Sequence, residues 1–294
     1  MKLAIIILNY NQSNLTILCL ASILYYTKGI DFKIFLVDNS DEISLKLSEY
    51  VVKYSNIDYI KNENNLGFTG GNNVGIRCAL KEGFEYIALI NNDTEFVDDS
   101  LVRTINKIRD STIAICGLAN YYFDNPTELW QAGLKYNLTK GSTKIITEFP
   151  VSQNILIPVD SIPGSSMIIK RSVFEKIGLL DSRFFAYYED IEFCIRAKKN
   201  NFEVAFLSSS KILHKVGSSS NSVFKTYLRT RNMLLFNFKF GSHYSLIKNL
   251  LWFLKSSTIL SLKNKNWKFI YAFILGCYDF IKKKFEKGSI TKFH

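Results

Sequence analysis

Four turns rich in Asn and Asp follow four apolar runs in the first third of the chain. They begin at Asn9, Asp38, Asn62 and Asn91. Turn chemistry alone favours Asn and Asp at such positions. Ligands of parallel α/β sheets bind beyond the carboxyl ends of the strands, so four such turns in succession indicate a binding rim.

Two carboxylates in these turns have specific chemical uses. Asp38 ends a strand-like run, where it can accept a hydrogen bond from a nucleobase N–H or a ribose hydroxyl. The alternative for Asp38 is a simple Asx-turn. Asp93 closes another apolar run, where it can hold Mg²⁺ or Mn²⁺ against a diphosphate. The alternative for Asp93 is an N-cap of the helix that follows.

A glycine-rich run spans residues 62–75. Gly67, Gly70 and Gly71 remove Cβ atoms where the backbone must approach a ligand. They open a predicted helix whose free N–H groups and positive dipole end suit a diphosphate. The run matches neither the Walker motif nor the dinucleotide-binding fingerprint. The alternative is a glycine-rich turn that allows tight helix packing.

Acidic residues and one histidine complete the candidate chemistry. Glu189, Asp190 and Glu192 lie at the start of a predicted helix, where they also complement the helix dipole. A carboxylate at this place can take a proton from an attacking hydroxyl. His214, one of three histidines, precedes a Gly/Ser-rich stretch, 215–220. A lone histidine is usually structural, but a neutral imidazole is also a good Mn²⁺ ligand.

Short apolar runs alternate with longer amphipathic ones as far as residue 118. Buried strands are expected at 3–8, 33–37, 57–60, 86–90 and 113–117. Helices are expected near 13–26, 41–54, 71–82 and 98–109, the last with N-cap chemistry from Asp98-Asp99-Ser100. This alternation predicts an α/β protein with a doubly wound, mostly parallel sheet.

The pattern changes after residue 118. Residues 119–162 predict an irregular or hairpin-rich insert that covers the sheet edge. A strand is then expected at 165–169 and a short helix at 172–177, ended by Gly178. A further amphipathic helix is expected at 189–199.

Charge divides the 294-residue chain unevenly. Residues 1–195 hold 18 Lys/Arg and 23 Asp/Glu, whereas residues 196–294 hold 19 Lys/Arg and 3 Asp/Glu, within a net charge of +11. The basic rear predicts an anionic partner, and nucleic acid, a membrane surface or a phosphorylated lipid all fit on charge. A nucleic-acid site would place basic residues around the rim, which is acidic instead, so no nucleic-acid partner is expected.

Localisation is expected from cysteine usage and from the apolar runs. Five scattered cysteines without a C-x-x-C pair fit a reducing compartment, and the first apolar run stops at Asn9, too early for a signal peptide. The rear runs 250–254 and 269–278 fall short of the roughly 20 residues of a spanning helix. With Trp252 and Trp267 among lysines, they suit an interfacial helix on an anionic membrane. The alternative is a helical cap whose lysines are simply solvated.

Taken together, these motifs resemble the family-2 glycosyltransferases with a GT-A fold, and most closely their bacterial rhamnosyltransferase-like branch. They occur in order along about 210 residues. The matching segments are Asn9-Tyr10-Asn11, Val37-Asp38-Asn39-Ser40, the run from Asn65 to Gly75, Asn91-Asn92-Asp93-Thr94, Gly164 with Lys170-Arg171, Glu189-Asp190 with Arg196, and His214 with Gly217.

The resemblance implies an activity. A GT-A catalytic domain would occupy residues 1–220, followed by a basic, aromatic helical region over 221–294. The enzyme would transfer rhamnose or a similar hexose, with inversion, from a dTDP- or UDP-sugar onto a hydroxyl of a glycan or a polyisoprenyl-diphosphate-linked acceptor. This step would serve surface-polysaccharide synthesis at the cytoplasmic face of the membrane, with the protein peripherally bound.

The resemblance also implies residue roles. Asp190 would be the catalytic base, Asp38 would contact the base or ribose, and Asp93 with His214 would hold Mn²⁺ or Mg²⁺. Asn91 stands where many relatives carry the first aspartate of Asp-x-Asp, so tight metal binding without nucleotide is not expected. The residues expected to bind the nucleotide sugar are Asn9, Asp38, Asn65, Gly67, Gly70, Gly71, Asn72, Asn92, Asp93, Gly164 and Glu189.

Two other functions remain open. A sugar-phosphate nucleotidyltransferase would usually carry an Arg/Lys-rich glycine loop directly after the first strand, and residues 9–14 contain none. A non-catalytic nucleotide- or nucleic-acid-binding protein is the other alternative, suggested by the basic rear.

Overall fold

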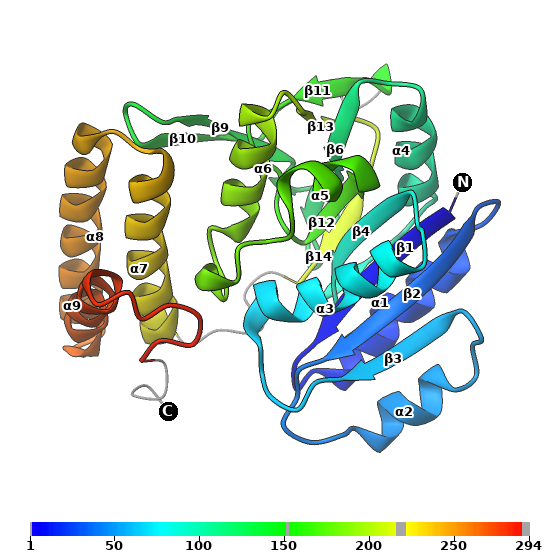
Figure 1. Ribbon diagram of the computed structural model, residues 1–294, viewed down its shortest axis with the longest axis horizontal. Coiled ribbons are helices and arrows are strands. Elements are labelled where there is room, and N and C mark those ends of the chain that lie inside the picture. The colour runs from blue at the N-terminus through cyan, green and yellow to red at the C-terminus, as the bar shows by residue number, and fades with distance from the viewer. Residues whose placement is uncertain (1, 151–152, 216–221, 290–294) are drawn as a thin grey trace.

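An eight-stranded sheet forms the centre of the protein (Figure 1). The computed structural model describes residues 2–150, 153–215 and 222–289. The strand order is β11-β13-β6-β12-β4-β1-β2-β3. The strands are β1 (Lys2–Asn9), β2 (Asp31–Asp38), β3 (Ile57–Lys61), β4 (Tyr86–Asn91), β6 (Ile113–Gly117), β11 (Leu156–Pro158), β12 (Ser166–Lys170) and β13 (Glu203–Leu207).

The sheet is mostly parallel, as the sequence predicts. β3, β2, β1 and β4 run parallel to one another, so their carboxyl ends meet at one edge. β12 is the exception at the centre, since it pairs antiparallel with both β4 and β6. The five strands expected before residue 118 are confirmed, each with ends within two residues of the observed ones.

Helices cover both faces of the sheet, and each face buries its own apolar cluster. Ile5 and Ile7 face one cluster, and Ala4 and Ile6 face the other. Burial on both faces explains why the strands are apolar at consecutive positions. One cluster includes α1 (Ser13–Tyr26), α2 (Leu45–Val51) and α4 (Ser100–Arg109), and the other includes α3 (Gly67–Lys81), α5 (Arg171–Ile177) and α6 (Glu189–Lys199).

Two helix boundaries differ from the sequence expectation. α2 is shorter than 41–54 because the Ser44 hydroxyl accepts from the Leu47 N–H and starts the helix late. α3 begins four residues before the expected 71, at Gly67. Elsewhere the Asp98 carboxylate accepts from the Ser100 N–H before α4, and Gly178 ends α5 at φ +76°.

The insert after β6 is strand-rich, as expected. β9 (Gly133–Asn137) and β10 (Ser142–Ile146) form a hairpin. A second small sheet has the order β5-β14-β7-β8 and places His214 opposite Thr94. Its strands are β5 (Thr94–Glu95), β7 (Asn120–Tyr122), β8 (Leu129–Gln131) and β14 (Ile212–His214), and a short 3₁₀ helix, η2 (Ser182–Phe184), precedes α6.

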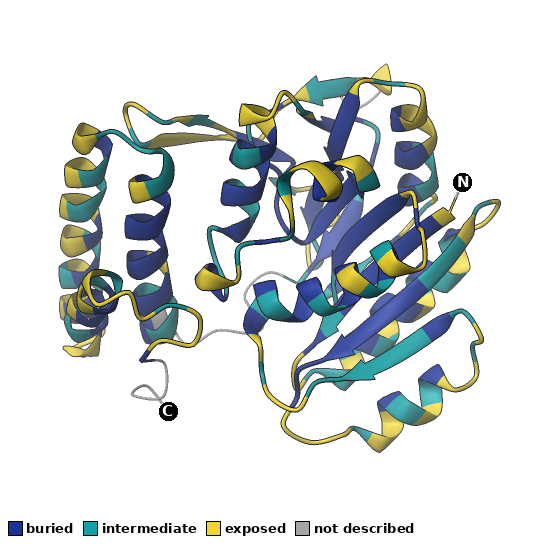
Figure 2. Ribbon diagram, in the orientation of Figure 1, coloured by how far each residue is buried: buried dark blue, intermediate teal, exposed yellow. Residues whose placement is uncertain are grey.

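Three helices, α7 (Ser222–Phe240), α8 (His243–Lys263) and α9 (Lys268–Ile281), pack together beside α6 (Figure 1). α7 is largely buried, whereas the outer side of α8 is exposed (Figure 2). Within the described ranges, no helix is long and apolar enough to cross a membrane. The expected division at residue 220 falls in the segment 216–221, outside the described residues.

Candidate functional site

Asn9 and Asp38 meet at the carboxyl edge of the sheet. The Asn9 side-chain amide donates to Asp38 Oδ1 (2.8 Å) and to the Ser40 hydroxyl (3.1 Å). Its Oδ1 accepts from Thr16 Oγ1 (2.7 Å), which also accepts from the Asn92 amide (2.9 Å). The ends of β1, β2 and β4 are therefore joined by one hydrogen-bonded chain.

Both oxygens of the Asp38 carboxylate accept hydrogen bonds from protein donors. The Ser40 N–H also donates to Oδ1 (3.0 Å), and the Tyr59 hydroxyl donates to Oδ2 (2.6 Å). Burial alone would raise the pKa of Asp38, but hydrogen bonds from Ser40, Tyr59 and Asn9 outweigh it and lower the pKa. Asn9 and Asp38 are fully buried, so contact of either with a nucleoside stays a prediction.

Asn39 connects this edge to the glycine-rich run. Its side-chain amide donates to the Gly67 carbonyl (3.0 Å) and to Asn65 Oδ1 (3.3 Å). Asn65 Oδ1 also accepts from the Gly67 N–H (2.8 Å), and the Thr69 N–H donates to the Phe185 carbonyl (3.0 Å). Two amides of the first turn of α3 are thus used within the protein and are not available to a phosphate.

Packing explains several of the glycines. A Cβ at Gly71 would lie 2.4 Å from Leu8 Cδ1, and one at Gly75 would lie 2.6 Å from Ile6 Cγ2. α3 therefore needs both glycines to lie close against β1. Gly70 faces Leu66 within its own helix, and the Asn72 amide donates to the Phe68 carbonyl. Contact of Gly70, Gly71 and Asn72 with a nucleotide sugar stays a prediction.

The second small sheet brings Asp93 and His214 together. His214 Nε2 lies 3.2 Å from Asp93 Oδ1, and the Lys215 N–H donates to the Asp93 carbonyl (2.9 Å). The His214 ring lies edge-on to Trp130 with centroids 4.8 Å apart. Both side chains are about nine-tenths buried. The sequence prediction that these two residues form one site agrees with this contact.

The donor set fits a divalent cation. Among the residues described, the buried Nδ1 of His214 has no hydrogen-bond partner. A carboxylate and an imidazole suit Mn²⁺ or Mg²⁺ when a diphosphate and water supply the other ligands. No group of three His, Cys, Asp or Glu side chains gathers within the described part of the chain. The residues of 215–220 beyond Lys215, including Gly217, lie outside it.

A strained turn presents Glu189 and Asp190 at the start of α6. Phe185, Tyr187 and Tyr188 have φ values of +61°, +71° and +75°. Each such conformation costs a non-glycine residue about 1–3 kcal/mol and persists only where neighbouring structure enforces it. Asp190 Oδ2 accepts from the Gly164 N–H (3.2 Å) and Oδ1 from the Ile191 N–H (2.8 Å). Gly164 thus lies beside Asp190, and its contact with a nucleotide sugar stays a prediction.

The two adjacent carboxyls titrate differently. Burial, followed by the negative charge of Asp190, raises the pKa of Glu189 well above its ordinary range. Burial also raises the pKa of Asp190, but N–H groups of Ile191 and Gly164 oppose that rise. The pKa of Glu189 is raised more strongly than that of Asp190, so Asp190 is the more readily ionised member of the pair. Among the described residues, Glu189 Oε2 has no hydrogen-bond partner.

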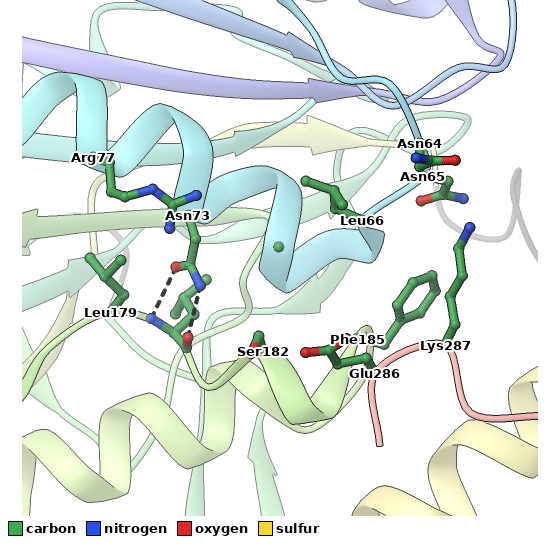
Figure 3. Close-up of a pocket in the computed structure, with 12 residues that line it drawn as sticks. Asn64, Asn65, Leu66, Asn73, Arg77, Leu179, Ser182, Phe185, Glu286 and Lys287 are labelled. Carbon is green, nitrogen blue, oxygen red and sulfur yellow. Dashed lines mark hydrogen bonds between the residues drawn. The ribbon is translucent and has the colours of Figure 1, made fainter. Parts of the chain in front are cut away.

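A cavity of about 540 Å³ lies between α3, the segment 179–185 and the tail at Glu286 and Lys287 (Figure 3). Asn73 borders it and bonds to both the N–H and the carbonyl of Leu180. Of the residues expected to bind a nucleotide sugar, Asn65 and Gly70 line this cavity. The cavity is therefore a neighbour of the polar rim, not the rim itself.

The sequence profile of glycosyl transferase family 2 matches residues 4–178, more than half of the chain. The chain belongs to glycosyl transferase family 2. The matched segment of this glycosyl transferase family 2 chain includes the polar rim as far as Asp93. Asp190 and His214 lie after this segment in the sequence. The family expected from the motifs is confirmed.

Curated relatives agree with the rhamnosyltransferase-like resemblance. The low-salt glycan biosynthesis hexosyltransferase Agl10 of Haloferax volcanii is 33% identical over 211 residues, covering 68% of this chain and 65% of Agl10. The dTDP-rhamnosyl transferase RfbF of Shigella flexneri is 24% identical over 221 residues, covering 69% of each chain. The match thus spans slightly less than two thirds of Agl10.

A solved structure confirms the GT-A fold. The mannosyltransferase PcManGT from Pyrobaculum calidifontis, in complex with GDP-Man and Mn²⁺, matches with a TM-score of 0.60 and 11% identity. The match covers 96% of this chain and 87% of PcManGT. At this identity the likeness concerns the fold alone.

Sequence reasoning missed the side chains that support the site from behind. Tyr59 and Thr16 fix Asp38 and Asn9, and Arg231 and Asn232 on α7 are fully buried beneath the strained turn. The sequence gives little signal for the last two, since they follow Arg229 and Thr230 in a run of four polar residues at 229–232.

Proposed function

We propose that this protein is an inverting glycosyltransferase that moves one sugar from a nucleoside-diphosphate donor onto an acceptor hydroxyl. The observation that carries the proposal is the Glu189–Asp190 pair at the start of α6, where a turn of residues at positive φ places the Asp190 carboxylate beside the Gly164 N–H. A chain of contacts links this pair, through Phe185, Thr69 and the start of α3, to the edge that holds Asp38.

Asp190 acts as the general base in this proposal. Its carboxylate takes the proton of the acceptor hydroxyl, and the hydroxyl oxygen forms a bond to the anomeric carbon of the donor. The bond from that carbon to the diphosphate breaks on the opposite face, and the nucleoside diphosphate leaves with the bonding electron pair. One displacement inverts the anomeric centre. A positioned general base contributes about 10²–10⁴-fold.

The Asn9–Asp38 edge binds the nucleoside in this proposal. Asp38 Oδ2 has one protein donor, the Tyr59 hydroxyl, and a carboxylate oxygen can accept from two donors. The second acceptor position of Oδ2 would take a ribose hydroxyl or a nucleobase N–H. RfbF is named as a dTDP-rhamnosyl transferase, which supports a dTDP- or UDP-linked rhamnose or similar hexose as donor.

Asp93 and His214 would hold the divalent cation. Bound Mn²⁺ or Mg²⁺ supplies positive charge that offsets the charge of the departing diphosphate. Mn²⁺ is present in the structure of PcManGT, which shares this fold. Glu189, Asn65, Asn92 and the glycine-rich run complete the contacts to the donor.

The rival functions fit less well. A nucleotidyltransferase would need basic residues after β1, where Asn9 instead bonds to Asp38. A nucleic-acid-binding protein would need cations at the rim, where the structure has Asp38, Asp93 and Asp190. Family membership also favours sugar transfer over both alternatives.

A donor panel tests this function. The purified protein is mixed with dTDP-, UDP- and GDP-sugars and with glycan or polyisoprenyl-diphosphate-linked acceptors, and products are read by NMR. The expected result is one preferred donor and a product of inverted anomeric configuration. A retained configuration would contradict the single displacement. Formation of a nucleotide sugar from a sugar phosphate and a nucleoside triphosphate would establish the nucleotidyltransferase instead.

We further propose that the acceptor is presented at the cytoplasmic face of a membrane, to which the rear helices bind peripherally. Tyr244, Leu251 and Leu262 are spaced to share one exposed side of α8, together with Lys248 and Lys255. Exposed aromatic and aliphatic side chains mixed with lysine suit a membrane interface. The exposed large apolar residues of α8, α9 and their linker are Tyr244, Ile247, Leu251, Trp252, Leu254, Ile259, Leu262, Trp267, Ile274, Tyr278 and Ile281.

Vesicle co-sedimentation tests the membrane proposal. The protein should bind anionic vesicles at low salt and be released at high salt, since each Lys or Arg near the surface contributes about 1 kcal/mol. Leu251→Ser with Trp252→Ser should weaken binding, whereas Leu45→Ser, on the exposed side of α2, should not. If the protein does not bind anionic vesicles at low salt, or if the Leu45 control loses binding equally, the rear helices only cap the core.

A further inference from the structure

One side chain of α7, Asn232, donates hydrogen bonds to the turn that precedes Asp190. The Asn232 amide nitrogen lies 2.7 Å from the Phe184 carbonyl, 2.7 Å from the Ala186 carbonyl and 2.8 Å from the Tyr187 carbonyl. Asn232 is fully buried. Its amide therefore donates to the strained segment directly before Glu189.

Arg231 fixes the orientation of Asn232. Its Nε and Nη2 donate to Asn232 Oδ1 at 3.1 Å and 3.0 Å, which identifies the other side-chain atom of Asn232 as the donor. Nη2 also lies 3.2 Å from the Phe184 carbonyl, and Nη1 donates to the Glu286 carbonyl (2.8 Å). Arg231 is fully buried, so these hydrogen bonds fix the position of its guanidinium group.

The same turn is held on its other side by α3. The Thr69 N–H donates to the Phe185 carbonyl, and a Cβ at Gly67 would lie 2.5 Å from the Phe185 ring. Phe185 and Tyr187, both at positive φ, are therefore fixed between the start of α3 and Asn232. Non-glycine residues keep this conformation only where neighbouring groups enforce it.

We propose that Arg231 and Asn232 are positioning residues for the transfer reaction, which hold the backbone before α6 so that the Asp190 carboxylate faces the acceptor hydroxyl. This inference rests on the proposed role of Asp190. Neither residue touches the reacting atoms. They act through the carbonyls of 184–187, whose geometry sets the direction in which α6 begins.

A matched pair of substitutions on α7 tests the proposal. Asn232→Asp keeps the side-chain size and the acceptor for Arg231 but removes the donor to the three carbonyls. Asn237→Asp makes the same change at another buried asparagine of α7, whose amide donates to the Met233 carbonyl (2.9 Å) within the helix. Both variants introduce a buried carboxyl, beside the Arg231 guanidinium at 232 and beside the Ser245 hydroxyl at 237, and only the Asn232 variant changes the contact with the turn.

The expected result is a lower kcat with a nearly unchanged KM. Misplacing a reacting group by about 1 Å can cost on the order of 10²-fold in rate, so Asn232→Asp should lower kcat about 10–100-fold. Its donor KM and its Kd for the free nucleoside diphosphate should stay within about threefold. Asn237→Asp should keep wild-type kcat at a similar Tm. Hydrogen exchange should accelerate at the amides of 185–190 in the Asn232 variant alone.

Three outcomes separate this inference from the role of Asp190. If Asp190→Asn is inactive and Asn232→Asp matches the Asn237 control in kcat and exchange, the positioning role is wrong and the base stands. If Asp190→Asn stays active while Asn232→Asp loses kcat, the turn is positioned for a different base. If Asn232→Asp does not fold, Arg231→Lys, which keeps the charge but loses the forked donors, must show the same lower kcat with a nearly unchanged KM; an unchanged kcat there would overturn the proposal.

Discussion

Two ends of the polar rim differ in how their buried groups are satisfied. At the nucleotide end, defined by Asn9 and Asp38, both oxygens of the Asp38 carboxylate accept hydrogen bonds from protein donors. At the reaction end, defined by Asp93, Glu189, Asp190 and His214, buried atoms of Glu189 and His214 have no hydrogen-bond partner among the described residues. These atoms are Glu189 Oε2 and His214 Nδ1.

The difference in hydrogen bonding between the two ends indicates where the fold accepts costs in folding free energy. A buried polar atom without a partner costs about 1–3 kcal/mol, and backbone strain of similar size lies in the turn at 185–188. Both costs fall at the reaction end, whose groups we propose to meet a substrate and a cation. The nucleotide end is preorganised by its own contacts instead, so binding there should depend less on the state of the reaction end.

The largest expected effect comes from removing the divalent cation. Chelation with EDTA should abolish transfer, and added Mn²⁺ or Mg²⁺ should restore it, because the adjacent Asp93 and His214 are the residues that we propose as ligands of the cation. Asp93→Ala and His214→Ala should each raise the metal concentration required for half activity. Full activity in chelator, with both variants normal, would contradict the metal-dependent reaction.

The fall of kcat at low pH should show which of the two adjacent carboxyls must be ionised for transfer. Burial raises the pKa of Asp190, so transfer should fall tenfold per pH unit from a pH above the ordinary aspartate value of about 3.9. Glu189→Gln should leave this fall at the same pH, because Gln resembles the protonated Glu189. A fall that moves toward lower pH in Glu189→Gln would show that Glu189 carries charge when Asp190 ionises.

Stability should depend on pH with opposite sign at the two ends. The pKa of Asp38 is lowered on folding, so its contribution is present above its unfolded value of about 3.9 and is lost as pH falls. The pKa of Glu189 is raised, so its contribution is present below about 4.3 and is lost as pH rises toward its folded value.

The Tm of two variants, measured at several pH values, tests this difference in pH dependence. Glu189→Gln should raise Tm more at alkaline than at acid pH, since above the unfolded pKa of about 4.3 ionisation of Glu189 favours the unfolded state. Asp38→Asn should lower Tm at pH 7 and lose most of that effect at strongly acid pH. Parallel pH dependence in the two variants would show that the two ends do not differ as described.

The smallest expected effect concerns Tyr59. Tyr59→Phe removes the hydroxyl that bonds to Asp38 Oδ2, so a nucleoside donor should reach that oxygen more easily. Donor Kd should then stay unchanged or improve by a few-fold, on the scale of one hydrogen bond of about 0.5–1.5 kcal/mol. Isothermal titration with the nucleoside diphosphate measures this. Weakening by tenfold would show that Tyr59 orients Asp38 for binding and does not compete for it.

The sequence predicts the sheet well because its signals are local. Strands buried on both faces need apolar residues at consecutive positions, and the polar turns at Asn9, Asp38 and Asn91 follow directly. The helix at Glu189 was also visible from its acidic first turn.

Long-range partners could not be read from one sequence. Asn232 bonds to carbonyls 45–48 residues away, and Gly67 packs on Phe185 from a distant part of the chain. Gly71 illustrates the same limit, since both a ligand contact and close packing on β1 require glycine there. Only the fold shows that packing requires it.

Donor binding and transfer measured on the same sample of Asp190→Asn test the central claim most directly. Asparagine keeps the side-chain size and cannot act as a base near neutral pH. The account predicts a donor Kd within a few-fold of wild type and a kcat reduced by about 10²-fold or more. Retention of more than about a tenth of wild-type kcat, on the same scale of base catalysis, would contradict it and move the role to another residue, with Glu189 the next to test.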